Sequence, residues 1–331
     1  MAESLLEVKE LEVTFSVSGL YFKAVDNVKF HIKKKETLGI IGESGCGKSV
    51  TALSIMGLIP NPPGRITSGE IIFEGEDLLK KSPKEMRKIR GNRISMIFQE
   101  PMTSLNPLMT IGEQIMEVYS THKNMPVSDA RNKAIEMLKL VGIPMAEQRI
   151  KDFPHQLSGG MRQRVMIAMA LVCNPALLIA DEPTTALDVT IQAQILKLIK
   201  DLKEKLDTSI IIISHDLGVI AEIADRVIVM YGGQIVEHSD VKSLFKDPLH
   251  PYTIGLLNSI PRADVKQDTL QPIEGMVPSI YDMPKGCRFA PRCKIAKEIC
   301  HTSEPDLVEV ENRQARCFKY SKSREVMVNW N

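Results

Sequence analysis

A strand, a glycine-rich loop and a helix succeed one another in residues 39–58, GIIGESGCGKSVTALSIMGL. The loop, GESGCGKS, fits the pattern G-x-x-x-x-G-K-[ST] in full. Glycines let backbone N–H groups turn inward around phosphate oxygens, at the positive end of the helix that follows. The segment therefore predicts an α/β scaffold with a phosphate-binding loop made of Gly42, Glu43, Ser44, Gly45, Cys46, Gly47, Lys48, Ser49 and Val50.

Two polar side chains of this loop and two further along the chain can bind phosphate, Mg²⁺ and the attacking water. Lys48 supplies positive charge to the β- and γ-phosphates of a nucleoside triphosphate, and the Ser49 hydroxyl is placed to ligate Mg²⁺. Further along, the apolar segment ALLIA ends in Asp181 and Glu182. We expect Asp181 to hold the Mg²⁺ shell, and Glu182 to orient or deprotonate the attacking water.

Two more buried strands also end in polar residues. Gln99 follows RISMIF and can touch Mg²⁺ or the water, and His215 follows IIIIS and can hydrogen-bond the γ-phosphate. Alone, a glutamine such as Gln99 is more often plain surface, and a histidine such as His215 is usually structural. Because four strand ends converge on one edge of a parallel sheet, the set favours a nucleotide-hydrolysing site with Lys48, Gln99, Glu182 and His215 as its catalytic residues.

The remaining pattern outlines the domains. Alternating segments 5–15 and 21–32 predict an antiparallel hairpin. From Thr37 onward, short buried strands alternate with amphipathic helices and indicate a mainly parallel sheet, with strands at 38–41, 71–73, 94–98, 177–180, 210–213 and 227–230. Residues 99–164 show helical spacing alone, and the α/β rhythm stops near 240. We expect an ATPase domain at 1–240 and a C-terminal region at 241–331.

Composition limits the partners. The 331 residues are 44% hydrophobic and 25% charged, with a net charge of +1, which gives no general reason to expect nucleic acid or an anionic membrane surface. The N-terminus lacks the basic flank and long apolar run of a signal peptide. Apolar runs stay far below the ~20 residues of a membrane span. We therefore expect a cytosolic chain that contacts a membrane only through a partner.

A second anion site is indicated by LSGGM, residues 157–161, in front of a helix. Ser158 is well placed as the N-cap, and the free N–H groups and dipole of the helix suit an anion. The helix lies beyond the insertion and cannot easily fold back onto its own phosphate loop. Ser158, Gly159 and Gly160 are therefore expected to bind the nucleotide of another chain, with two subunits head-to-tail and ATP between them.

Taken together, GESGCGKS, Gln99, LSGGM, LIADEP, TALD and ISHD resemble the ATP-binding subunit of an ABC transporter over residues 5–260. The resemblance implies a P-loop NTPase fold with an N-terminal antiparallel β subdomain and an all-helical insertion. It implies that Ala186-Leu187-Asp188 couples the two ATP sites of a dimer. It also implies an aromatic ring stacked on adenine, for which Phe15 is our choice, with Tyr21 and Phe22 as alternatives.

Two longer segments, residues 98–115 and 247–262, resemble the dipeptide/oligopeptide and nickel branch of ABC importers. In that branch a second, different ATPase subunit, two membrane permease subunits and an extracytoplasmic binding protein complete the transporter. The resemblance implies peptide import energised from the cytoplasmic face of the membrane, with residues 102–109 facing the permeases. A nickel or other small-solute importer, a soluble ATPase acting on nucleic acid, and a binding module without turnover remain as alternatives.

Four of the six cysteines lie in one C-terminal span, at Cys287, Cys293, Cys300 and Cys317. Their gaps of five, six and sixteen residues lack the C-x₂-C of common zinc ribbons, so spacing alone decides little. Some ATPases of peptide importers carry a [4Fe–4S] cluster in this region. That resemblance favours an iron–sulfur cluster here, with Zn²⁺ and free thiols as alternatives. Cys46 and Cys173 are expected to be packing residues.

Overall fold

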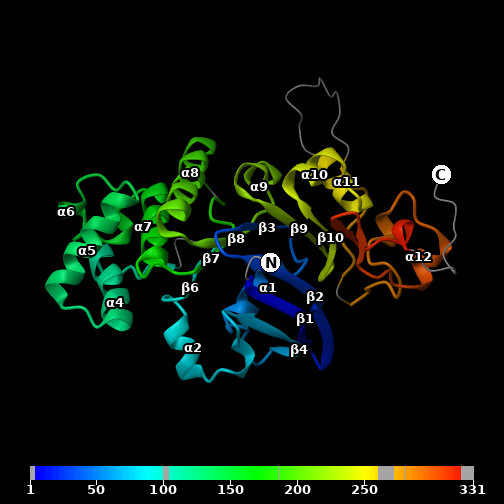
Figure 1. Cartoon of the computed structure of the whole chain (residues 1–331), viewed down its shortest axis with the longest axis horizontal. Coiled ribbons are helices and arrows are strands. Elements are labelled where there is room, and N and C mark those ends of the chain that lie inside the picture. Colours follow the sequence, from blue (N-terminus) through cyan, green and yellow to red (C-terminus); the bar gives the residue numbers. More distant parts are fainter. Residues whose placement is uncertain (1–3, 100–103, 186, 260–271, 280, 322–331) are drawn as a thin grey trace. The chain divides into compact units, whose positions relative to one another are not determined.

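Two compact units make up the computed structural model, which describes residues 4–99, 104–185, 187–259, 272–279 and 281–321 (Figure 1). The first unit consists of Met1–Leu6, Ile32–Thr37 and Phe73–Ile213. The second consists of Glu7–His31, Leu38–Ile72 and Ser214–Asn331. The chain passes between the units several times, so neither unit is a continuous stretch of sequence.

Buried parallel strands form the centre of the first unit. Their order is β8 (Ser209–Ile213), β7 (Leu177–Asp181) and β6 (Ile94–Ile97), and both pairs are parallel. Every residue of β7 and β8 is buried. Unbroken apolar segments of this kind are typical of a sheet covered by helices on both faces. The predicted strands at 94–98, 177–180 and 210–213 are confirmed.

Helices fill the predicted insertion, and the described residues 104–164 contain no strand. α4 (Ile111–Lys123) contacts α5 (Val127–Leu140) and α7 (Gly159–Leu171), while α7 also contacts β6 and α8 (Val189–Leu206). α4 starts at a capping box in which Thr110 Oγ1 accepts from Glu113 N and Glu113 Oε2 accepts from Thr110 N. The bounds are α4 (Ile111–Lys123), α5 (Val127–Leu140), α6 (Ala146–Arg149), η2 (Pro154–Gln156), α7 (Gly159–Leu171) and α8 (Val189–Leu206). Before the insertion come β5 (Glu76–Asp77), η1 (Leu78–Lys80) and α2 (Pro83–Ile89).

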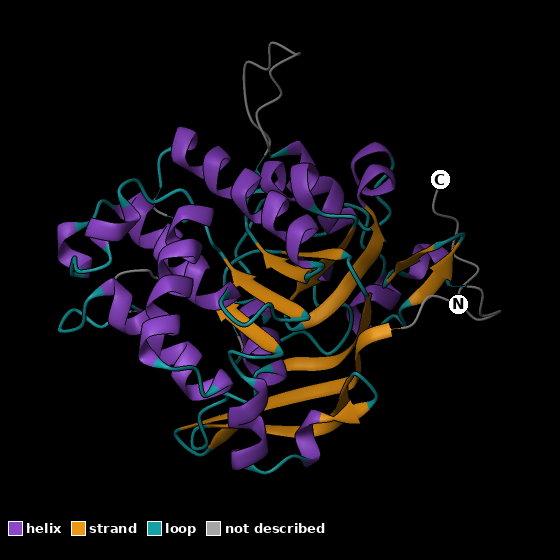
Figure 2. Ribbon diagram, turned by 60° about the vertical axis from the view of Figure 1, so that its left-hand side comes forward, coloured by secondary structure: helices purple, strands orange, loops and turns teal. Residues whose placement is uncertain are grey.

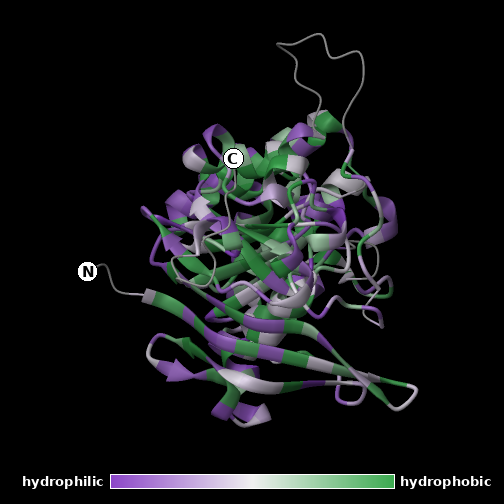
Figure 3. Cartoon of the chain, turned by 90° about the vertical axis from the view of Figure 1, so that its right-hand side faces the viewer, coloured by the Kyte–Doolittle hydropathy of each residue, from purple (hydrophilic) through white to green (hydrophobic). Residues whose placement is uncertain are grey.

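The N-terminal hairpin gives the second unit its antiparallel sheet. β1 (Ser4–Val17) and β2 (Leu20–Lys33) are joined by Ser18 and Gly19, at φ 51° and 81°. Such a left-handed two-residue turn matches the twist of antiparallel strands. Hydrophobic and hydrophilic residues alternate along the strands of this sheet (Figure 3), as half-buried strands require. The predicted hairpin is confirmed.

β4 (Gly64–Phe73) corrects one prediction, because it lies beside β1 in the order β2-β1-β4. Residues 71–73 therefore do not belong to the parallel sheet. Only the end of this strand is apolar, and the preceding GRITSGE is too polar to be recognised as a strand. Gly69, at φ 106°, fits closely against the hairpin, since a Cβ there would lie 2.7 Å from Leu11 Cα. Residues 64–73 therefore form a strand because they pair with β1, although their own hydrophobic pattern does not predict one.

The second unit also holds strands in the order β11-β12-β10-β9-β3. β3 (Thr37–Ile41) and β9 (Arg226–Tyr231) are parallel and confirm the predicted strands at 38–41 and 227–230. β10 (Gln234–Asp240), β11 (Val308–Val310) and β12 (Arg313–Ala315) add antiparallel pairs and were not predicted. β11 and β12 have three residues each, which is too short for an alternating pattern to be recognised from sequence.

Short helices complete the second unit (Figure 2). Glu237 of β10 is fully buried, and its carboxylate accepts from the backbone N–H groups of Leu249 and His250, each at 2.8 Å. This pair of hydrogen bonds fixes the start of α11 against β10. The bounds are α1 (Lys48–Ile55), α9 (Leu217–Ile223), α10 (Val241–Lys246), α11 (Pro251–Asn258), η3 (Ala290–Arg292), α12 (Glu298–Thr302) and η4 (Phe318–Tyr320).

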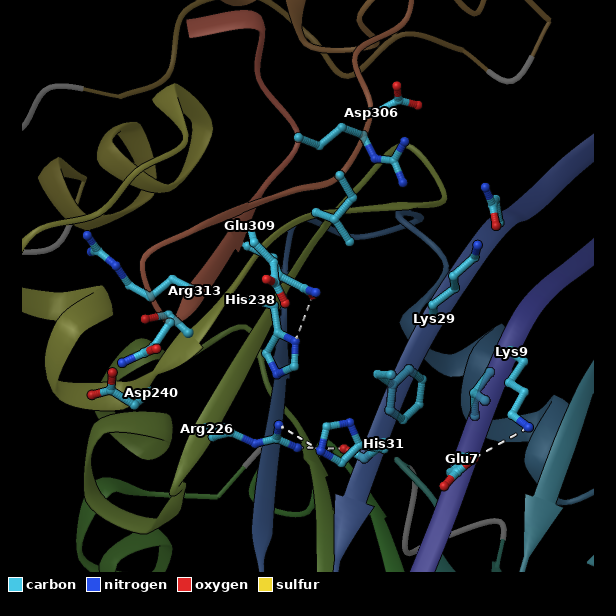
Figure 4. A pocket seen from close by; sticks show the side chains of 18 of the residues that line it. Glu7, Lys9, Lys29, His31, Arg226, His238, Asp240, Asp306, Glu309 and Arg313 are labelled. Atoms are coloured by element: carbon cyan, nitrogen blue, oxygen red, sulfur yellow. Dashed lines mark hydrogen bonds and ion pairs between the residues drawn. The ribbon is translucent and has the colours of Figure 1, made fainter. Parts of the chain in front are cut away.

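A groove of about 950 Å³ lies in the second unit, lined by residues of β1 and β2 and by residues of β9, β10, β11 and β12 (Figure 4). It contains none of the residues predicted to bind nucleotide. Its wall includes five basic and five acidic side chains, so formal charge is balanced and no ligand class is favoured. They are Lys9, Lys29, Arg226, Arg313 and Arg316, and Glu7, Asp240, Asp306, Glu309 and Glu311.

His238 is a buried histidine of this wall. The residue is 9% exposed, and its Nδ1 lies 3.4 Å from Gln314 Oε1. Burial, followed by the positive charge of Arg226, lowers the pKa of His238 from 6.5 to about 4. The imidazole is therefore neutral in the folded protein at physiological pH.

This lowered pKa predicts a loss of stability in acid. Between pH 6.5 and pH 4 the unfolded chain binds a proton at His238 that the folded chain does not bind. The free energy of unfolding should therefore fall through this window, by up to roughly 3 kcal/mol from this group. Urea unfolding of the wild type and of His238→Gln across pH 7 to 4 measures the difference. If the two stability curves run parallel, the buried neutral histidine does not contribute.

Candidate nucleotide site

The predicted site residues fall into two sets, one in each unit. The second unit contains the loop Gly42 to Val50, together with Phe15 and His215. The first unit contains Gln99, Ser158, Gly159, Gly160, Asp181, Glu182 and Asp188. Ala186 and residues 100–103, which include the start of the expected permease-facing segment, lie outside the described residues.

Close backbone packing shapes the phosphate loop between β3 and α1. Gly42, at φ 150°, leaves no room for a side chain, since a Cβ would lie 2.2 Å from the carbonyl oxygen of Met230. A Cβ on Gly47, at φ 102°, would lie 2.7 Å from the carbonyl oxygen of Ala24. Both positions therefore require glycine for conformation and for space. Around a Cβ on Gly45, in contrast, no heavy atom lies within 4 Å, so the loop is open on that side.

Lys48 is held by the loop that it belongs to. The residue is 6% exposed, and Nζ donates to the carbonyl oxygens of Gly42 at 2.7 Å and Glu43 at 3.0 Å. Residues 48–55 then form α1, so the ammonium group stands beside a helix N-terminus. Positive charge, inward-turned backbone and helix dipole together suit a phosphate group. The donor set of this loop therefore fits a nucleoside triphosphate.

The second set centres on Glu182. Asp181 ends β7 and is buried, and Glu182 follows at φ 48°, a left-handed conformation that is uncommon for a residue with a side chain. Glu182 Oε2 accepts from Gln99 Nε2 and from Thr185 Oγ1, each at 2.9 Å. Two predicted residues are thus brought together. Thr185 was not predicted, although a hydroxyl three residues after the acid in DEPTT was a usable signal.

The LSGGM segment begins α7 as expected. Ser158 is the N-cap, with Met161 N donating to its Oγ at 3.4 Å, and Ser158 and Gly159 are exposed. The arginines of this helix are engaged elsewhere: Arg162 donates to the carbonyl oxygen of Pro154 and Arg164 to that of Val141. An anion at this N-terminus would therefore meet backbone N–H groups and the Ser158 hydroxyl rather than a guanidinium.

Asp188 lies next to the same segment. Its carboxylate caps α8 by accepting from Ile191 N at 2.9 Å. A Cβ on Gly160 would lie 2.9 Å from Ile191 Cγ2, so the glycine lets α7 approach α8 closely. A change at Asp188 can therefore reach the LSGGM segment through the first turn of α8.

Two more predicted residues, His215 and Phe15, lie in the second unit. His215 is exposed and precedes the Asp216 cap of α9. Phe15 is half-buried, and a Cβ on Gly64 would lie 2.7 Å from its ring. Of the alternatives, Tyr21 is 77% exposed, and Phe22 meets Tyr281 edge-on with ring centroids 4.5 Å apart.

The four C-terminal cysteines are free thiols that line one small apolar cavity of about 10 Å³ with His250, Phe289 and Phe318. Burial raises the pKa of Cys287 to about 11 and that of Cys317 to about 12. Within the described part of the chain, no group of three or more His, Cys, Asp or Glu side chains is placed to hold a metal ion. The four thiols thus line one cavity, but they are not arranged as the ligands of the expected iron–sulfur or zinc site.

Across the residues that the structure describes, none of the helices combines the length and the apolar character needed to span a bilayer.

Residues 25–185 match the ABC transporter family, and residues 236–300 match the oligopeptide/dipeptide transporter, C-terminal region. The oligopeptide transport ATP-binding protein AppD of Bacillus subtilis is 58% identical, over 96% of this chain and 98% of the relative. The oligopeptide transport ATP-binding protein OppD of Escherichia coli is 51% identical, over 96% of this chain and 94% of the relative.

Solved structures extend the likeness to the fold. The dimeric ATP-binding cassette MJ0796, bound to ADP and Pi, superposes with a TM-score of 0.64 at 30% identity, over 71% of this chain and 98% of that chain. CbiO1 of Clostridium perfringens, part of the ABC transporter complex cbiONQ, gives 0.64 at 29% identity over 74% and 92%. The chain therefore belongs to the ATP-binding proteins of ABC transporters, in the branch that carries the oligopeptide/dipeptide transporter C-terminal region.

Proposed function

We propose that this ABC ATPase energises the import of dipeptides or oligopeptides. The observation that carries the catalytic part is the orientation of the Glu182 carboxylate by Gln99 and Thr185, at the end of β7. The peptide cargo is supported by the relatives AppD and OppD, which are named for oligopeptide transport. The proposal keeps the expected domains, an ATPase domain at 1–240 and a C-terminal region at 241–331.

The catalytic roles follow from chemistry. Lys48 binds the β- and γ-phosphates, and Glu182 polarises the attacking water while Gln99 and Thr185 hold its carboxylate in one orientation. His215 is assigned to the γ-phosphate and Phe15 to adenine. The residues that would hold Mg²⁺ are Ser49, Gln99 and Asp181, and the ion would neutralise phosphate charge there.

A second chain completes the site in this proposal. Exposure of Ser158 and Gly159 at the N-terminus of the 13-residue helix α7 supports phosphate binding from a neighbouring subunit. The solved relative MJ0796 is described as a dimer. The partner is proposed to be a homologous, different ATP-binding subunit, so that two ATP molecules lie between the pair, with Asp188 coupling the two sites.

The rest of the assembly follows from the branch. We propose two membrane permease subunits, an extracytoplasmic peptide-binding protein, and a peripheral position on the cytoplasmic face of the membrane. An importer for nickel or another small solute is the alternative within the branch. A nucleic-acid function is disfavoured by the net charge of +1.

Replacing Glu182 tests the base. Glu182→Gln should bind ATP and trap the closed dimer, with turnover reduced on the order of 100-fold or more, because an amide cannot accept the proton. Steady-state phosphate release and size-exclusion chromatography with ATP measure the two effects. Glu117→Gln, an exposed change on α4, is the matched control. Undiminished turnover in Glu182→Gln would refute the assignment.

Replacing Ser158 tests the contact between chains. Ser158→Arg should abolish hydrolysis and leave nucleotide binding intact, because the phosphate loop of the same chain is untouched. Ser128→Arg, at the start of α5, adds the same side chain to another exposed serine of a helix N-terminus. If Ser158→Arg loses nucleotide binding while Ser128→Arg keeps it, Ser158 binds the nucleotide of its own chain.

The four-cysteine cavity is proposed to hold a [4Fe–4S] cluster, with Zn²⁺ as the alternative. The proposal rests on the resemblance to peptide-importer ATPases, some of which carry such a cluster in this region, and on the presence of all four thiols on one cavity. Such a cluster would hold together a segment with few core residues of its own.

Metal analysis decides this assignment. The full chain, purified without oxygen, should be brown and contain four iron and four sulfide per chain, and Cys300→Ser should lose both. Cys173→Ser, in the first unit, should keep them. Colourless protein with stoichiometric zinc, or with no metal, contradicts the cluster.

A further inference from the structure

Two arginines of the C-terminal cysteine segment extend to the nucleotide-binding part of the second unit. Arg288 follows Cys287 and Arg292 precedes Cys293, so both lie within the short stretch between two of the cavity thiols. Neither guanidinium faces solvent, with side-chain exposures of 12% and 4%.

Arg292 binds the phosphate loop directly. Its Nη1 lies 2.6 Å from Glu43 Oε2 and its Nη2 lies 3.0 Å from Glu43 Oε1, which is a bidentate pair. The planar guanidinium fixes both the position and the orientation of the carboxylate. Glu43 belongs to the GESGCGKS loop, yet its side chain is directed to the C-terminal region instead of to the phosphate side.

The remaining N–H groups of Arg292 are also engaged. Nε donates to the carbonyl oxygen of Glu274 at 3.1 Å and Nη2 to that of Ile273 at 3.3 Å. Nη1 also donates to Tyr231 Oη at 3.4 Å, and the guanidinium lies 5.8 Å from the centre of that ring. A buried side chain with this many hydrogen bonds is held in one conformation, so it can act as a rigid support for Glu43.

The backbone of Glu43 is held from the same region. Its N–H donates to Tyr252 Oη at 2.8 Å, and Tyr252 packs on Tyr231 and Phe289. Its carbonyl oxygen accepts from Lys48 Nζ at 3.0 Å. Displacement of Glu43 would therefore move one of the two carbonyl groups that hold the ammonium group of Lys48.

Arg288 supports the other side of the loop. It donates to the carbonyl oxygen of Gly232 and pairs with Asp26. The next residue, Gly233, donates its N–H to the carbonyl oxygen of Cys46 at 3.0 Å and accepts from Asp26 N at 2.9 Å. The turn between β9 and β10 thus connects Arg288 to the middle of the phosphate loop.

We propose that Arg292 is a positioning residue for the phosphate loop, so that the C-terminal cysteine segment sets the nucleotide affinity of the ATPase. Arg292 acts through Glu43, and Arg288 supports the same loop through the β9–β10 turn. The inference rests on the proposed nucleotide site at Lys48. It gives the C-terminal region a role in ATP binding that does not depend on whether its thiols hold a metal.

The test compares substitutions of both partners in the full-length chain. Binding of a fluorescent ATP analogue with Mg²⁺, the KM and kcat of hydrolysis, and the thermal midpoint are measured for Arg292→Gln, Arg292→Lys, Glu43→Gln and the double Gln variant. Lys294→Gln is the matched control, since Lys294 lies two residues away with a side chain 72% exposed. It should bind the analogue as the wild type does.

Arg292→Gln should weaken binding about tenfold and raise KM, with kcat changed far less, as expected for the loss of one buried charged pair. Arg292→Lys, which keeps the charge but not the fork, should fall between Arg292→Gln and the wild type. The double Gln variant should be no weaker than Arg292→Gln, because the two residues act as one unit. Should Arg292→Gln fail to fold, Arg292→Lys with its intermediate affinity decides the test.

Two results overturn the inference. One is that Arg292→Gln or Arg292→Lys folds and binds the analogue with wild-type affinity but has a lowered thermal midpoint. This result is expected if Arg292 only stabilises the fold. The other is full additivity of the Glu43 and Arg292 effects. Lys48→Ala separates this failure from a failure of the proposed site: if Lys48→Ala also binds the analogue normally, the nucleotide site itself is misplaced.

Discussion

The phosphate loop depends on backbone packed against backbone. At Gly42 and Gly47 no side chain fits, because carbonyl oxygens of Met230 and Ala24 occupy the space that a Cβ needs. This close approach curls the loop so that the carbonyl groups of Gly42 and Glu43 both face Lys48. A side chain at either glycine would open the loop and release the lysine, and for this reason the loop chemistry cannot be separated from the strands around it.

The same backbone packing explains how the C-terminal region supports the phosphate loop. Met230 is the second-last residue of β9, the turn after β9 continues through Gly232 and Gly233 into β10, and β10 pairs with β12 of the C-terminal region. Arg288 and Arg292 then bind the turn and Glu43. In the first unit, Glu182 is held by Thr185, three residues further on, and by Gln99, which follows the adjacent strand β6. The lysine loop is therefore supported from far along the chain, whereas the candidate base is supported by neighbours in its own sheet edge.

Sequence patterns predicted what is local. The hairpin, the buried strands β3, β6, β7, β8 and β9, and the cap at Ser158 follow from periodicity and residue type over a few positions. Residues 71–73 were assigned to the wrong sheet because Gly69 and the contact with β1 decide that strand. The pair between Glu43 and Arg292 joins positions 249 apart in sequence, and no local pattern encodes it. The four C-terminal cysteines show the opposite. They are clustered in sequence, which favoured a metal site, but they do not form a metal-binding group in the described structure.

Mixing two inactive variants tests most directly whether two chains share each ATP. When two copies of this chain take the place of the two different subunits in a head-to-tail dimer, one copy with Lys48→Ala and one with Ser158→Arg leave one of the two sites with both an intact Lys48 and an intact Ser158. The account predicts that each purified variant is inactive alone and that hydrolysis returns when the two are combined. If the mixture stays as inactive as its components while still forming dimers, Lys48 and Ser158 do not act on one nucleotide across the interface.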